Sequence, residues 1–156
     1  MSDPVIDLGH QGVDASPLPS ITEHAHTGHG TVYVIVSWVL QDSRLNDEDS
    51  IGITVPWDVF IKGDHWNPDD MAWAQALGRT ISMGVQQGVP LDRYVRTLSG
   101  IRCDHPHIAR TDGQERTIES AADGVAWALH RIDLRLKGEL NGSVEADRGE
   151  AETGPC

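Results

Sequence analysis

The chain has 156 residues, 38% of them hydrophobic, and its 24 acidic residues outnumber 12 lysines and arginines, which gives a formal charge of −12. This length fits a single domain with tails. Nucleic acids and anionic membranes repel so acidic a chain, which excludes both as default partners. No apolar run approaches the ~20 residues that a membrane-spanning helix needs.

The sequence favours a cytoplasmic location. Residues 1–30 contain neither lysine nor arginine and no apolar run, so we expect neither a secretory signal nor a transit peptide there. The two cysteines, Cys103 and Cys156, allow at most one bridge. That is too few for a disulfide scaffold and is typical of a reducing compartment.

A long-loop β-hairpin is predicted after a loose N-terminal segment, residues 1–29, which is rich in glycine, proline, serine and histidine. The run from Thr31 to Leu40 is β-branched and aromatic, which is typical of a strand buried on both faces. From Ile51 to Lys62, six apolar residues recur at every second position and indicate another strand. Because Pro56 cannot donate a ladder hydrogen bond, it predicts an edge strand or a bulge.

Three helices are predicted after the hairpin. Residues 67–70 supply a capping Asn, then Pro and two acids, which start a helix that Gly88 ends. A short helix follows over 91–100, where apolar residues recur at helical spacing. The last helix begins at Ser120, and Asp123 has the spacing of a capping box.

These elements define an α+β domain over residues 30–138, with a small antiparallel sheet followed by three helices. Because a two-stranded sheet is marginal alone, we expect a third strand near Val5–Leu8 or pairing of the exposed edge with another chain, such as a second copy. Residues 139–156 carry five acids and one base, and we expect a disordered acidic tail there.

The order of motifs over residues 30–137 resembles the TSCPD domain. Its most specific part is the Gly-Val-Pro-Leu step, residues 88–91, which ends one helix and starts the next. The resemblance rests on four segments, GTVYVIV, PWDVFIKG, AWAQALGRTISMGVQQGVPLDRYVRTLSGIRC and ESAADGVAWAL. This domain is found at the C-terminal end of cobalamin-dependent ribonucleotide reductases and as small free-standing proteins, including in phages.

The chain departs from the family at the Thr-Ser-Cys-Pro-Asp pentad, which reads Glu-Ser-Ala-Ala-Asp over 119–123. Ser120 and Asp123 are kept. If the pentad serves as the start of a helix, these two residues can cap it without the Cys and the Pro. Any redox or metal role of the pentad cysteine in relatives is therefore missing here.

The resemblance implies ribonucleotide reduction in deoxyribonucleotide supply for DNA synthesis. That oxidoreductase chemistry uses a thiyl radical and reducing cysteine pairs, whereas this sequence has two cysteines in all. We therefore expect no catalytic residues in this chain. We expect it to be an accessory or regulatory module of the cobalamin-dependent ribonucleoside-diphosphate reductase. The large reductase chain would be the partner and would bind the cobalamin. The alternative is a binding protein for a small ligand, either a nucleotide phosphate or zinc.

The histidines offer a candidate zinc site. His24, His26 and His29 lie in a glycine-containing run, and His105 and His107 follow Cys103 closely. Cysteine and histidine suit zinc, so Cys103, His105 and His107 are the predicted ligands. Solvated loop histidines without a metal are the open alternative.

Arginines cluster between the last two predicted helices, and Arg93, Arg96 and Arg102 are the candidate nucleotide-phosphate ligands. Asp92, Asp104, Asp112 and Glu115 are interleaved and could instead pair with these and neighbouring arginines. Five tryptophans beside one phenylalanine leave a similar choice between internal packing and a partner surface.

Overall fold

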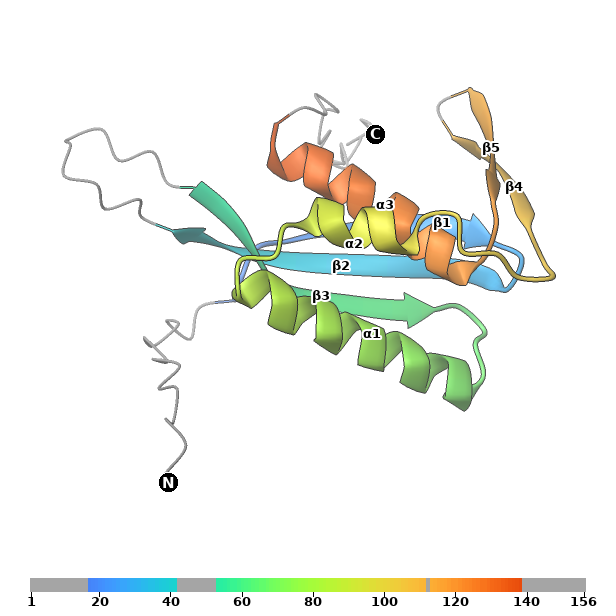
Figure 1. Ribbon diagram of the computed structural model, residues 1–156, viewed down its shortest axis with the longest axis horizontal. Coiled ribbons are helices and arrows are strands. Elements are labelled where there is room, and N and C mark those ends of the chain that lie inside the picture. The colour runs from blue at the N-terminus through green and yellow to red at the C-terminus, as the bar shows by residue number, and fades with distance from the viewer. Residues whose placement is uncertain (1–16, 42–52, 112, 139–156) are drawn as a thin grey trace, which may run out of the picture.

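The computed structural model describes residues 17–41, 53–111 and 113–138 and is an α+β fold (Figure 1). Three strands form an antiparallel sheet in the order β1-β2-β3, and a separate hairpin consists of β4 and β5. In chain order the elements are β1 (Ser20–Thr27), β2 (Gly30–Gln41), β3 (Ile53–Gly63), α1 (Pro68–Gln86), α2 (Leu91–Leu98), β4 (His107–Thr111), β5 (Gln114–Ile118) and α3 (Ala121–Leu136). The predicted antiparallel sheet and three helices are confirmed.

One face of the sheet carries the core. Helix α1 packs on β3, α3 packs on β1 and β2, and α2 packs on α3. Val34 of β2, Ile81 of α1 and Leu129 of α3 are fully buried in the cluster between these layers. On the opposite face, Tyr33 and Phe60 are exposed. The prediction that Thr31–Leu40 is buried on both faces is therefore wrong, because the helices cover a single face of the sheet.

The predictions made from Pro56 are both confirmed. Strand β3 lies at the edge of the sheet. The pairing register with β2 shifts where Ser37 faces Asp58 and the next residue, Trp38, faces Pro56. Trp57 is thus the additional residue of a bulge, which lets a proline sit in the strand without breaking a central ladder.

Helix α1 covers the outer edge of β3. The Ser82 hydroxyl accepts the Val59 N–H at 2.8 Å, and Gln86 Nε2 donates to the Trp57 carbonyl oxygen at 3.0 Å. Gly78 permits this contact, because a Cβ there would lie 2.8 Å from the Val59 carbonyl oxygen. Side chains of α1 thus occupy edge groups that were expected to pair with another chain.

The third strand comes from residues 20–27, which lie inside the segment 1–29 that was expected to be loose. The alternating burial along β1 is the mark of a strand with one covered face. Val5–Leu8 and the tail 139–156 lie outside the described residues, so those two predictions stay untested. The β4–β5 hairpin was not predicted, because its sequence is largely polar and its strands have five residues each.

The termini of α1 follow the sequence closely. Asn67 Oδ1 accepts the Asp70 N–H at 2.9 Å, and Pro68 takes the first helical position. Both Asp69 and Asp70 stand in the first turn, where the helix dipole favours acids. The helix ends at Gln86, and Gly88 has a positive φ of 85°. In the part of the chain that the structure describes, no helix is long and apolar enough to cross a membrane.

Candidate functional site

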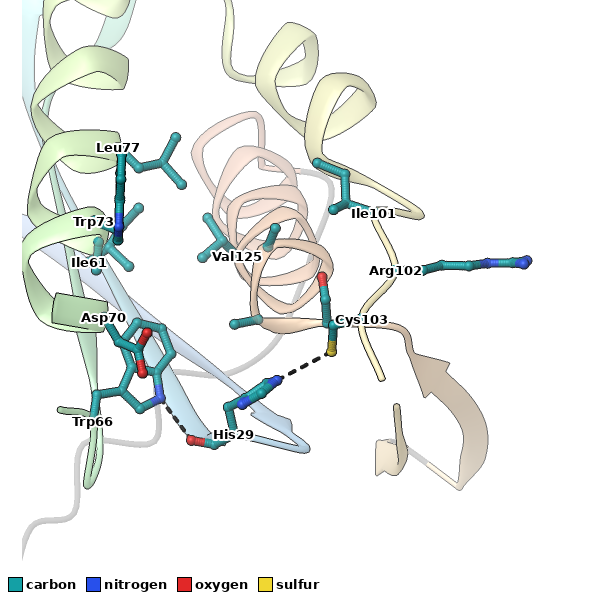
Figure 2. Close-up of a pocket in the computed structure, with 14 residues that line it drawn as sticks. His29, Ile61, Trp66, Asp70, Trp73, Leu77, Ile101, Arg102, Cys103 and Val125 are labelled. Atoms are coloured by element: carbon teal, nitrogen blue, oxygen red, sulfur yellow. Dashed lines mark hydrogen bonds between the residues drawn. The ribbon is translucent and has the colours of Figure 1, made fainter. Parts of the chain in front are cut away.

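A largely apolar pocket of about 340 Å³ lies where the N-terminal half of α1, the loop after α2 and the start of α3 converge (Figure 2). Ile61 of β3, Leu77 of α1 and Val125 of α3 are among the residues that line it. The charged side chains in its lining are those of Asp70 and Arg102, and in Figure 2 the Arg102 side chain points away from the cavity. The lining is completed by His29, Trp66, Trp73, Ala74, Ile101, Cys103, Ser120, Ala121 and Ala122.

Two tryptophans form one side of this pocket. Trp66 packs over Gly63, where a Cβ would overlap its ring, and its Nε1–H donates to the His29 carbonyl oxygen at 2.8 Å (Figure 2). Trp73 stands on α1 with 76% of its surface exposed. Tryptophan is among the residues enriched at the centres of protein interfaces.

Cys103 forms the opposite side with the first turn of α3. Its backbone N–H donates to the Glu119 carbonyl oxygen at 3.1 Å, which fixes the loop after α2 beside the start of α3. His29 Nε2 lies 3.3 Å from Cys103 Sγ (Figure 2). The turn between β1 and β2 and the loop after α2 therefore meet at the pocket edge.

The start of α3 agrees with the predicted cap at Ser120 and differs at Asp123. Ser120 Oγ accepts the Asp123 N–H at 3.2 Å, as an N-cap does. The Asp123 carboxylate does not return to the Ser120 N–H, as a capping box requires. It accepts the N–H groups of Gly100 at 2.8 Å and Glu119 at 3.1 Å. Asp123 thus joins the end of α2 to the start of α3 while almost fully buried.

Of the predicted zinc ligands, Cys103 and His105 lie together, and His107 lies elsewhere. The third member of the cluster is His29, and the ligand atoms of these three residues all lie within 4.8 Å of one another. His107 belongs to β4, and its ring is 6.5 Å from that of His26. The sequence places His107 two residues from His105, but the strand start turns it toward β1. His29 was singled out in the sequence, although its proximity to Cys103 depends on the fold.

The predicted nucleotide ligands do not converge on the pocket. Arg102 is in its lining, whereas Arg93 and Arg96 are exposed residues of α2. Arg96 pairs with Asp92 at 3.0 Å, and Arg102 Nε lies 3.9 Å from Glu119 Oε2. The Arg96–Asp92 pair matches the alternative expected from the interleaved acids, whereas Glu119 was not among the acids named for it.

Trp127 is explained by packing. The Arg116 guanidinium lies 4.6 Å from the centre of its ring, and that of Arg131 lies 5.7 Å away. The ring is half-buried against the core cluster. Such stacking stabilises both the arginines and the indole without any partner.

A model of the TSCPD domain family matches residues 16–133, which run from just before β1 into the last turns of α3. Ala121 and Ala122, which stand in place of Cys-Pro in the pentad that residues 119–123 resemble, both line the pocket. No curated protein and no solved structure gives a significant match.

Proposed function

The chain belongs to the TSCPD domain family, and from that premise we propose that it is an accessory module of a cobalamin-dependent ribonucleoside-diphosphate reductase. The TSCPD domain is associated with ribonucleotide reductases, and the match over residues 16–133 is the observation that carries this proposal. The proposed partner is the large reductase chain, which would supply the cobalamin site and the radical chemistry.

The cysteine content supports an accessory role over an independent enzyme. Reduction of a ribonucleotide requires a radical-forming cysteine and a reducing pair, whereas this sequence contains Cys103 and Cys156. Cys103 is paired with His29, and no second cysteine stands beside it among the described residues. The module would act by binding the reductase and changing its activity or location.

We assign the contact with the reductase to the rim of the pocket, the surface around Trp73 and Ile101. Trp73 and Ile101 are both exposed large apolar residues, and both line the same pocket. Aromatic anchors beside an apolar cavity are typical centres of protein interfaces. A hydrophobic side chain of the reductase entering this cavity would be shielded from water by the two residues.

The test is a calorimetric titration of the chain into the large reductase chain from the same genome. We expect micromolar or tighter binding, and a loss of at least tenfold with Trp73→Ala. Met83→Ala is the matched control, because Met83 is an equally exposed apolar residue of α1 outside this pocket. Reductase turnover with and without the bound module then separates activation or inhibition from tethering. Absence of binding by the parent chain would contradict the proposal.

Nucleotide binding through Arg93, Arg96 and Arg102 remains a separate prediction. It requires that ATP or dATP raise the melting temperature of the isolated chain, because a ligand that binds the native state stabilises it. Replacement of all three arginines would remove that rise. A melting temperature that is flat across both nucleotides would rule this ligand class out.

A further inference from the structure

We propose that His29, Cys103 and His105 form a binding site for a zinc ion at the edge of the pocket. The ligand atoms come from two loops that the fold brings together, the turn between β1 and β2 and the loop between α2 and β4. Neutral imidazoles and a thiolate are the ligand set that zinc prefers. This inference rests on geometry alone and is independent of any reductase partner.

The spacing of the ligand atoms fits a zinc ion. Tetrahedral bonds of about 2.3 Å to sulfur and about 2.0–2.1 Å to nitrogen place the two ligand atoms roughly 3.6 Å apart. The distance from His29 Nε2 to Cys103 Sγ is 3.3 Å, and no pair in the cluster exceeds 4.8 Å. The rings of His29 and His105 are 5.1 Å apart and steeply inclined. Small side-chain rotations would bring all three atoms to bonding distance.

The turn that carries His29 is held firmly by its neighbours. Thr27 Oγ1 accepts the His29 N–H at 3.1 Å and donates to the Gly30 carbonyl oxygen at 2.7 Å. Trp66 binds the His29 carbonyl oxygen from the other side. At Gly28 the turn touches the opposite loop so closely that a Cβ would lie 1.9 Å from the His105 carbonyl oxygen. The backbone that carries His29 is therefore fixed beside the opposite loop before a metal arrives, which reduces the cost of binding.

Two backbone groups contact the Cys103 sulfur. The backbone N–H of His105 donates to Cys103 Sγ at 3.4 Å, and outer-shell contacts of this kind orient a sulfur toward a metal. The thiol in turn lies 3.4 Å from the Glu119 carbonyl oxygen, to which it can donate while protonated. Zinc binding would release that proton. His29 and His105 are exposed and Cys103 is half-buried, so an ion can reach the site.

Three protein ligands leave one coordination position for water or for a group on another molecule. Structural zinc sites are typically closed by four protein ligands, whereas sites that exchange ligands keep one position open. Because His29 and Cys103 also line the apolar pocket, a molecule held in the pocket could reach the metal. The class of ligand inferred for the site is thus Zn²⁺ with one exchangeable donor.

The test is a titration of the full chain with Co²⁺ and Zn²⁺ in a Cys156→Ser background, where Cys103 is the single thiol. We expect one Co²⁺ per chain, with a thiolate-to-cobalt charge-transfer absorption that Zn²⁺ abolishes. His29→Gln and Cys103→Ser should weaken Zn²⁺ affinity more than about tenfold, since even outer-shell changes cost that much. His107→Gln is the matched control and should retain the parent affinity and spectrum.

Either of two titration results would overturn the proposal. One is the absence of a charge-transfer band from the reduced protein. The other is a loss with His107→Gln that equals the loss with His29→Gln, which would identify an adventitious surface histidine site. Circular dichroism shows whether each variant is folded. As a second measurement on the parent, Zn²⁺ should slow alkylation of Cys103, and an unchanged rate would contradict the site.

Discussion

His29 and Cys103 are 74 positions apart in the chain, yet His29 Nε2 lies 3.3 Å from Cys103 Sγ. Two backbone contacts make this possible. Trp66 holds the carbonyl group of His29, and Cys103 is fixed to Glu119 beside the first turn of α3. The pocket edge is consequently a meeting point of three loops and one helix start.

Gly28→Ala should separate the two sides of this edge without removing any polar side chain. Its Cβ would overlap the His105 carbonyl group, so one loop must move. Overpacking of this kind costs about 1–3 kcal/mol in free energy of unfolding. The alkylation rate of Cys103, measured without metal, should rise as its contact with His29 opens. A variant with the parent's stability and alkylation rate would show that the loops do not press together here.

Asp123→Ala should destabilise the domain more than Ser120→Ala. The Ser120 change removes one N-cap, which costs about 1 kcal/mol. The Asp123 change leaves the N–H groups of Gly100 and Glu119 without their buried acceptor, at about 2–3 kcal/mol. Urea denaturation of both variants checks the order. An equal loss would mean that Asp123 acts only within the helix cap.

Much of the fold was predictable where the chemistry is local. The Asn67 cap and the end of α1 before Gly88 depend on residues adjacent in sequence, and so does the bulge at Pro56. Strand β1 was missed because Glu23 and Thr27 are polar residues on its covered face, so the apolar half of the expected alternation is incomplete. The partial burial of β2 also depends on tertiary packing, since its sequence alone does not show which face the helices cover.

The sequence predicted the residue types of the candidate zinc site, cysteine and histidine. It did not predict which three residues come together. Cys103 and His105 are neighbours, so their proximity is local. His29 replaces His107 because the turn before β2 and the loop after α2 are brought together by long-range packing. The dual role of Asp123 was equally hidden, since Gly100 approaches it only when α2 docks on α3.

Gly78→Ala should destabilise the protein although alanine is the better helix former. The added Cβ would meet the Val59 carbonyl oxygen at 2.8 Å, and this backbone atom cannot move without disturbing β3. Gly84→Ala is the control in the same helix, because its Cβ would meet the end of the Tyr94 side chain, which can rotate. Thermal unfolding should show a larger loss for Gly78→Ala. The reverse order would mean that α1 does not pack this closely on the sheet edge.

Glu23→Ala should weaken the attachment of β1 to α3. The carboxylate is buried, with Arg135 Nη2 at 2.6 Å and Arg131 Nε at 3.3 Å. Loss of these charged contacts should cost about 1.5–3 kcal/mol. In the exposed Arg110–Glu115 pair, Glu115→Ala should cost at most about 1 kcal/mol. Chemical denaturation of both variants tests the contrast, and equal losses would show that Glu23 contributes no more than a surface ion pair.

The most direct test of the accessory role is light scattering after size exclusion, on the chain alone and mixed with the large reductase chain. We predict that the mixture elutes as one species whose mass is the sum of both proteins. The Met83→Ala variant should co-elute with the reductase in the same way as the parent chain. Trp73→Ala should elute separately from the reductase. Separate elution of the parent chain and the reductase at micromolar concentrations would contradict the account.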